Sequence, residues 1–132
     1  MNATDLARVL LVDDNREILD RAAALLSPMC TIVGAVSDGL AALESVRTLR
    51  PDVVVLDISM PGMNGLEVAA QLRRAGSQVQ IVFLTIHDDE ELVLAAEAAG
   101  GIGYVSKTYL PSDLVVAVNE ACAGRRYVSQ LR

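Results

Sequence analysis

The sequence is poor in cysteine and in basic residues. Only two of its 132 residues are cysteines, Cys30 and Cys122, and they lie far apart among apolar neighbours. This pattern suggests neither a disulfide framework nor a cysteine metal cluster, and we expect both thiols to be buried and reduced. Eleven basic residues against 17 acidic ones give a net charge of −6, which would repel a nucleic acid backbone. The chain by itself is therefore a poor DNA-binding candidate.

Long apolar runs and histidine are also scarce. The N-terminal stretch 1–8 contains an acid and lacks a positive flank, and the apolar run Val9–Val12 is too short for a signal peptide or a membrane span. We therefore expect a cytoplasmic protein. His87 is the only histidine, and beside two aspartates it is expected to be a solvated loop residue rather than a catalytic group.

Short β-branched runs alternate five times with stretches of helical period. The predicted strands are Val9–Val12, Ile32–Val36, Val53–Leu56, Ile81–Leu84 and Gly103–Ser106. The predicted helices have these apolar positions in chain order: Ile18, Ala22, Leu25 and Leu26; Leu40, Leu43 and Val46; Leu66, Ala69, Ala70 and Leu72; Leu92, Ala95, Ala96 and Ala99; Leu114, Val118, Ala121 and Cys122. Strands that are apolar throughout indicate a parallel sheet covered on both faces. The predicted fold is a doubly wound α/β sandwich with five parallel strands.

Local signals mark the ends of these elements. Asp38 is placed to cap one helix, and Pro111 suits the first turn of another. Gly100-Gly101 should end the fourth helix, since glycine adopts left-handed backbone angles at little cost. Pro61-Gly62 predicts a turn after the third strand.

In such folds ligand sites lie at the carboxyl ends of the strands. The residues at these ends are Asp13, Asp14, Asp57, Thr85 and Lys107. Carboxylates ~4 Å apart repel by on the order of 4 kcal/mol per pair at an effective dielectric of about 20, so a positive group must sit among them. Oxygen ligands without histidine or cysteine favour Mg²⁺ over zinc, and Mg²⁺ usually binds alongside phosphate. The set therefore points to phosphoryl chemistry.

A capping role would explain any one of these acids alone. It does not explain the adjacent pair Asp13-Asp14, where one cap would suffice, or Asp57, which precedes a turn. Together with Asp57-Ile58-Ser59-Met60-Pro61-Gly62-Met63-Asn64-Gly65, Thr85 and Tyr104-Val105-Ser106-Lys107, the acid pair resembles the receiver domains of bacterial two-component response regulators. The resemblance covers essentially the whole chain. Ile81–Glu90 and Gly103–Lys107 resemble the NarL/FixJ type.

The resemblance implies a flavodoxin-like strand order of 2-1-3-4-5 and a mechanism. Asp57 would be the phosphoacceptor, with a histidine kinase as donor. Mg²⁺ would be bound by Asp14 directly, by Asp13 through water, by Asp57 and by the Ser59 carbonyl. Lys107 and Thr85 would contact the phosphoryl group, and Tyr104 would turn into the space that Thr85 vacates.

Two residues depart from the commonest pattern of the family. Thr108 follows Lys107 where many receivers have a cis proline, so we expect a trans peptide bond and a differently placed loop. Ile86 follows Thr85 where smaller residues are common, and its bulk is expected to narrow the path to the phosphoryl group.

The resemblance also suggests how the chain is organised. Residues 1–123 would form the receiver, and 124–132 would begin a linker to a helix-turn-helix domain outside this chain, with phosphorylation acting through homodimerisation or release of that domain. One alternative is a stand-alone receiver that acts through a protein partner or as a phosphate sink. Another is a Mg²⁺-dependent aspartyl phosphohydrolase, although such enzymes have a second acid where this chain has Ser59.

Overall fold

The computed structural model describes residues 6–86 and 90–129. Its strands form one parallel sheet in the order β2-β1-β3-β4-β5-β6. The strands are β1 (Ala7–Val12), β2 (Cys30–Val36), β3 (Val53–Asp57), β4 (Gln80–Thr85), β5 (Gly103–Ser106) and β6 (Tyr127–Val128). The helices are α1 (Arg16–Leu26), α2 (Gly39–Leu49), α3 (Gly65–Arg74), α4 (Glu90–Ala98), the short 3₁₀ helix η1 (Lys107–Tyr109) and α5 (Leu110–Cys122). The predicted doubly wound fold is confirmed.

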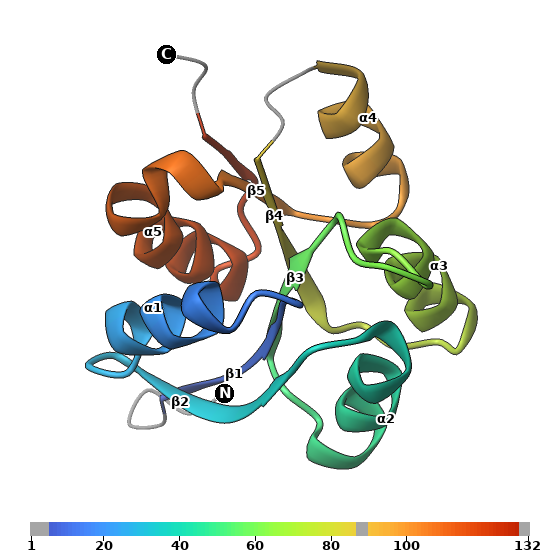
Figure 1. Cartoon of the computed structure of the whole chain (residues 1–132), viewed down its shortest axis with the longest axis horizontal. Coiled ribbons are helices and arrows are strands. Elements are labelled where there is room, and N and C mark those ends of the chain that lie inside the picture. The colour runs from blue at the N-terminus through green and yellow to red at the C-terminus, as the bar shows by residue number, and fades with distance from the viewer. Residues whose placement is uncertain (1–5, 87–89, 130–132) are drawn as a thin grey trace.

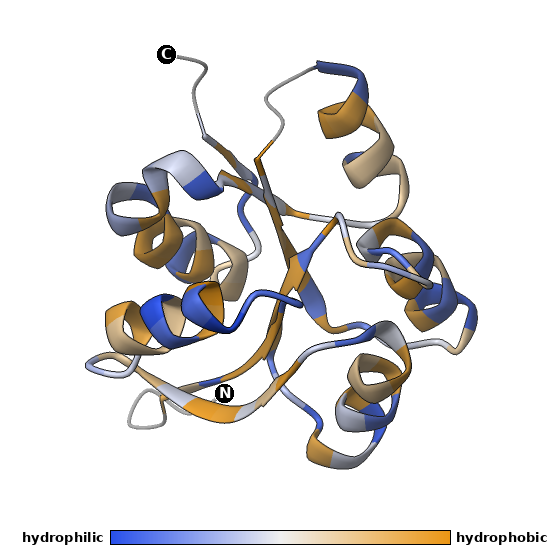
Figure 2. Cartoon of the chain, viewed as in Figure 1, coloured by the Kyte–Doolittle hydropathy of each residue, from blue (hydrophilic) through white to orange (hydrophobic). Residues whose placement is uncertain are grey.

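Helices cover both faces of the sheet (Figure 1). One core cluster joins α1 and α5 to one face of the strands, and a second joins α2, α3 and α4 to the other face. The hydrophobic colouring of the central strands, with mixed helices around them, shows the same layering (Figure 2). Alternate residues of the central strands therefore enter opposite cores, which is why these strands are apolar throughout.

Polar side chains fix the helix starts at the edge where the strands end. Asp38 accepts a hydrogen bond from the Ala41 backbone N–H at 2.8 Å, as its predicted capping role requires. Asn64 and Glu67 form a reciprocal capping box at the start of α3. Pro111 lies in the first turn of α5, and Gly100 after α4 has a φ of 98°, both as predicted.

The glycine that opens α3 lets this helix start against the end of β3. A Cβ atom on Gly65 would lie 2.2 Å from the backbone oxygen of Asp57. The Gly65 backbone N–H donates to the Ile58 carbonyl at 2.9 Å. Any side chain here would push the helix away from Asp57, so glycine permits the close approach.

The sheet has a sixth strand that the sequence analysis did not anticipate. Tyr127 and Val128 pair in parallel with Gly103 and Tyr104 of β5, within the stretch that was assigned to a linker. Two residues are too short to produce a recognisable period, so main-chain bonding rather than apolar patterning defines this strand. It covers the edge that β5 would otherwise expose.

Three predicted core positions are wrong. Cys122 is exposed because it ends α5 one residue after Ala121, which fills the core position; Cys30 is buried, and both thiols are free. Leu40 in the first turn of α2 is 71% exposed, and Ala95 of α4 is also exposed. On these two helices a narrower stripe than expected faces the sheet. Among the described residues, no helix has the length and apolar character needed to cross a membrane.

Candidate functional site

Three carboxylates meet at the carboxyl edge of the sheet. Asp13 and Asp14 follow β1, and Asp57 is the last residue of β3. One carboxylate oxygen from each lies within 4.8 Å of the others. Asp13 and Asp57 are each 1% exposed, whereas Asp14 is exposed. The parallel register of β1 and β3, in which Val12 pairs with Leu56, brings these strand ends together.

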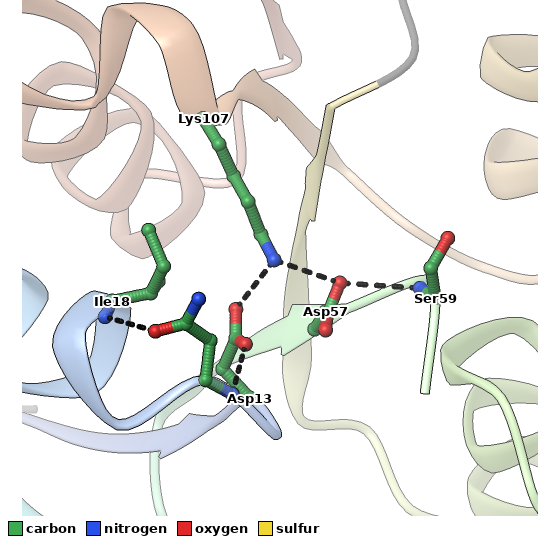
Figure 3. A network of polar contacts seen from close by, with 6 residues as sticks. Asp13, Ile18, Asp57, Ser59 and Lys107 are labelled. Atoms are coloured by element: carbon green, nitrogen blue, oxygen red, sulfur yellow. Dashed lines mark hydrogen bonds and ion pairs between the residues drawn. The ribbon is translucent and has the colours of Figure 1, made fainter. Parts of the chain in front are cut away.

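The Lys107 ammonium bridges the two buried acids (Figure 3). Its Nζ lies 2.8 Å from Asp13 Oδ2 and 3.2 Å from Asp57 Oδ1, and the side chain is only 13% exposed. Lys107 directly follows β5, so its side chain reaches across the end of the sheet toward β3 and β1. The three acids with one lysine carry an excess of negative charge, which leaves the site able to attract a further cation.

Backbone amides orient the buried carboxylates. The Asn15 N–H donates to Asp13 Oδ1 at 2.8 Å, and the Ser59 N–H donates to Asp57 Oδ1 at 3.1 Å. The Asn15 side chain in turn accepts from the Ile18 N–H at 3.2 Å and caps α1 (Figure 3). Asn15 was not predicted from the sequence, although an asparagine directly before a helical period is a recognisable signal for a cap.

Burial dominates the electrostatics of the central acid. Burial, the neighbouring charge of Asp13 and a hydrogen bond with Asp14 together raise the pKa of Asp57 to about 7, against the opposing effect of Lys107. Burial lowers the pKa of Lys107, but its bonds and charge interactions with Asp13 and Asp57 outweigh this and raise it overall. The ammonium is thus firmly charged, while Asp57 holds its negative charge at a cost.

The other predicted site residues lie on neighbouring strand ends. Thr85 ends β4, is buried, and pairs in register with Ser106. Tyr104 of β5 is 4% exposed and packs in the core cluster on the side of α4. Ser59 is exposed two residues beyond Asp57.

The departures from the family pattern have different outcomes. The Lys107–Thr108 peptide bond is trans, as predicted, since none of the described residues has a cis bond. Ile86 is 64% exposed, and its effect on access to the site stays a prediction. His87 lies outside the described residues.

We expect the raised pKa of Asp57 to make stability depend on pH. A folded-state pKa of about 7 against an ordinary value of 3.8 means that the folded chain holds this proton more tightly than the unfolded chain. The stabilisation of the folded state by the proton on Asp57 is therefore full below about pH 4 and is lost as pH rises through about 7. Asp57→Asn leaves the Lys107–Asp13 pair in place. At about pH 8 in chelator, its free energy of unfolding, measured by urea denaturation, should exceed that of the parent by on the order of 1 kcal/mol. A difference that stays the same at about pH 5 would contradict this account.

Comparisons with known proteins agree with this site. The response regulator receiver domain family matches residues 9–119. The chain is 36% identical over 132 residues to the nitrate/nitrite response regulator protein NarL of Escherichia coli K12, covering 98% of this chain and 61% of that protein. It is also 36% identical over 123 residues to the response regulator UvrY of the same organism, covering 92% of this chain and 56% of that protein.

Solved structures give the same result. The fold matches a LuxR-family two-component response regulator from Aurantimonas with a TM-score of 0.88 and 33% identity, covering 93% of this chain and 89% of that one. It matches the signal receiver domain of a NarL response regulator from Mycobacterium tuberculosis with a TM-score of 0.87 and 32% identity, covering 92% of this chain and 99% of that one. The chain therefore belongs to the response regulator receiver domain family and is of the NarL/FixJ (LuxR) type.

Proposed function

We propose that Asp57 accepts a phosphoryl group from a histidine kinase and that the resulting aspartyl phosphate switches the domain. The observation that carries this proposal is the position of Asp57, buried between a second acid and the Lys107 ammonium at the strand ends. The Ser59 N–H holds one of its oxygens, so the carboxylate is oriented for attack. This geometry supports a reacting carboxylate rather than a helix cap.

The proposed reaction is a direct phosphoryl transfer. A carboxylate oxygen of Asp57 forms a bond to phosphorus as the bond to the donor nitrogen breaks, and the electron pair leaves with the donor imidazole. Asp57 must be ionised to attack, and Lys107 stabilises that state and the charge on the transferred oxygens. Because Lys107 already spans Asp13 and Asp57, it is held in place before the phosphoryl group arrives.

The residues of the site fit Mg²⁺. They offer oxygen ligands, Asp14 is exposed, and the acids outnumber the single lysine. Asp13, Asp14, Asp57 and the Ser59 carbonyl would hold the ion, and neither histidine nor cysteine belongs to the acidic cluster of the described residues. When bound, Mg²⁺ supplies positive charge that offsets the acids and the phosphoryl oxygens.

We expect the chain to take up about one phosphoryl group from acetyl phosphate in the presence of Mg²⁺ and very little in chelator. Asp57→Asn should abolish the uptake, because an amide is a poor nucleophile at this position. Intact-protein mass spectrometry measures the uptake, and Asp20→Asn on the exposed surface of α1 is the matched control. Stoichiometric labelling of Asp57→Asn at another residue would rule out the proposed acceptor.

The proposed switch involves Thr85, Lys107 and Tyr104. Contacts from Thr85 and Lys107 to the phosphoryl group would exist only after transfer, and only such differential contacts shift a conformational equilibrium. The buried Tyr104 ring packs on the same side of the sheet as α4, so a shift of the loop after β4 would change its packing. Thr85 is also the register partner of Ser106 on the strand that carries Tyr104.

Thr85→Ala and Lys107→Ala should weaken the conformational response to beryllofluoride, a phosphoryl mimic, without unfolding the domain. Thr85→Ser, which keeps the hydroxyl, serves as the matched control for the first variant. Amide hydrogen exchange around Tyr104 measures the response. Equal exchange changes in the parent and both alanine variants would contradict the proposed switch.

An aspartyl phosphohydrolase would use the same kind of acceptor but would release phosphate in many turnovers. The chain belongs to a family of signalling domains, and Ser59 stands where such hydrolases carry a second acid. We propose a single transfer per activation rather than turnover. Release of many phosphates per chain from small phosphoesters would favour the hydrolase.

We propose that the receiver controls a helix-turn-helix domain that follows it in a longer protein, with a homodimer as the phosphorylated form. The chain spans 61% and 56% of the curated relatives NarL and UvrY. With a net charge of −6, this domain is unsuited to hold DNA by itself, so basic residues elsewhere must do so.

The natural coding sequence tests the proposed domain organisation. We expect it to continue past Arg132 into a basic segment with a helix-turn-helix pattern. A stop codon at that point, or an extension of another kind, would instead favour the stand-alone receiver with a protein partner.

A further inference from the structure

The C-terminal strand is bonded to the strand that leads to Lys107. In Figure 1 the C-terminal segment runs alongside β5, where Tyr127 pairs with Gly103 and Val128 with Tyr104. The Tyr127 N–H donates to the Ile102 carbonyl at 3.0 Å, and the Ser129 N–H donates to the Tyr104 carbonyl at 2.8 Å. Residues 127–129 are thus bonded to β5.

The Ser129 side chain links three parts of the fold. Its hydroxyl donates to Asp113 Oδ2 on α5 at 2.6 Å and accepts from the Ser106 backbone N–H at 3.1 Å. Ser129 is 6% exposed, Ser106 is 1% exposed and Asp113 is 3% exposed, so all three are shielded from water. Hydrogen bonds in such a dry setting are strong, and breaking them leaves buried polar groups unsatisfied.

The Ser106 backbone lies between β4, where Ser106 pairs with Thr85, and Ser129, which binds its N–H. Ser106 caps the short helix η1 without any side-chain capping bond, and its buried hydroxyl has no hydrogen-bond partner among the described residues. The next residue is Lys107, and Thr108 follows in place of the ring of a proline, which would stiffen the loop. On the side of β6, the bond from the Ser106 N–H to Ser129 therefore restrains the backbone directly before Lys107.

We propose that Ser129, held by Asp113, is a positioning residue for phosphoryl transfer. It fixes the Ser106 backbone and thereby the Cα position of Lys107. The ammonium of this lysine lies 2.8 Å from Asp13 and 3.2 Å from Asp57. The inference rests on the proposed function, in which Lys107 acts on the phosphoryl group. A small displacement at the root of this side chain is enough to lower the rate of transfer.

The same bond couples the C-terminal segment to the site. Ser129 reaches Ser106 only while β6 is paired with β5. Whatever follows Ser129 in a longer chain therefore acts on Lys107 when it pulls β6 away. By reciprocal linkage, a change in the contacts of Lys107 on phosphorylation acts on β6 with equal coupling free energy.

The first experiment compares two serine variants that contact the same carboxylate. Ser129→Ala removes the bonds to Asp113 and Ser106, whereas Ser112→Ala removes a 2.9 Å bond to the other oxygen of Asp113 and one to the Tyr109 carbonyl, leaving Ser106 untouched. At saturating Mg²⁺, Ser129→Ala should lower the rate constant of phosphoryl uptake from acetyl phosphate by roughly threefold to tenfold, and Ser112→Ala should not. Ser129→Thr, which keeps the hydroxyl, should restore the rate. The Mg²⁺ dissociation constant should stay unchanged in all three, because the acids do not move.

A double-mutant cycle tests whether the effect passes through Lys107. In a Lys107→Ala background, Ser129→Ala should have no further effect on the rate constant. An undiminished effect in that background, or equal rates for Ser129→Ala and Ser112→Ala, would overturn the proposal. If Ser129→Ala does not fold, the near-isosteric Ser129→Cys replaces it in the cycle, because a thiol weakens both bonds.

A measurement without phosphorylation separates this inference from the proposed function. In the unphosphorylated chain, the Ser106 amide should exchange with solvent faster in Ser129→Ala than in the parent or in Ser112→Ala. Unchanged Ser106 exchange overturns the role of Ser129 whether or not Asp57 is phosphorylated. Absence of phosphoryl uptake by the parent, with faster Ser106 exchange in Ser129→Ala, contradicts the proposed function alone.

Discussion

The site depends on one ammonium group that neutralises two buried carboxylates. Asp13 and Asp57 are almost completely shielded from water, and Lys107 contacts both. Without Lys107, the two buried carboxylates would lack a compensating charge, which is more costly than losing a surface ion pair. Because Asp14 adds a third acid at the same edge, the site stays short of positive charge even with Lys107 in place. That shortage makes it receptive to a cation.

The fold brings the buried carboxylates together by aligning strand ends and by close approaches of the backbone. The parallel register places the ends of β1 and β3 side by side, and the Asn15 and Ser59 amides then orient the carboxylates. Gly65 lets α3 begin against the Asp57 backbone, where a Cβ would lie 2.2 Å from the carbonyl oxygen. Gly65 thus has a steric role beside Asp57, distinct from the turn that Gly62 makes with a φ of 76°.

The sequence predicted what depends on strand ends and motif spacing. Asp13, Asp57 and Lys107 meet as expected, because the carboxyl ends of neighbouring parallel strands must lie together. It did not predict β6, which is set by main-chain bonds to β5 and leaves no periodic signal in two residues. It placed Leu40 and Cys122 in the core, since a period identifies a helix better than it identifies the width of the buried stripe. Ser129 was missed because its partners lie 16 and 23 residues away in sequence.

The four residues of β5 connect Lys107 to the C-terminal strand β6. Gly103 and Tyr104 pair with β6 on one side and with β4 on the other, and Ser106 pairs with Thr85 while its N–H is bound by Ser129. The strand is extended and bonded along both edges, so Lys107 cannot shift at its root without straining the bonds of Ser106. Side-chain relays can break at one contact, whereas a doubly bonded strand moves as a unit. The coupling that we propose between Lys107 and β6 therefore needs no long pathway of side chains, because the strand directly before the lysine is the strand to which β6 is bound.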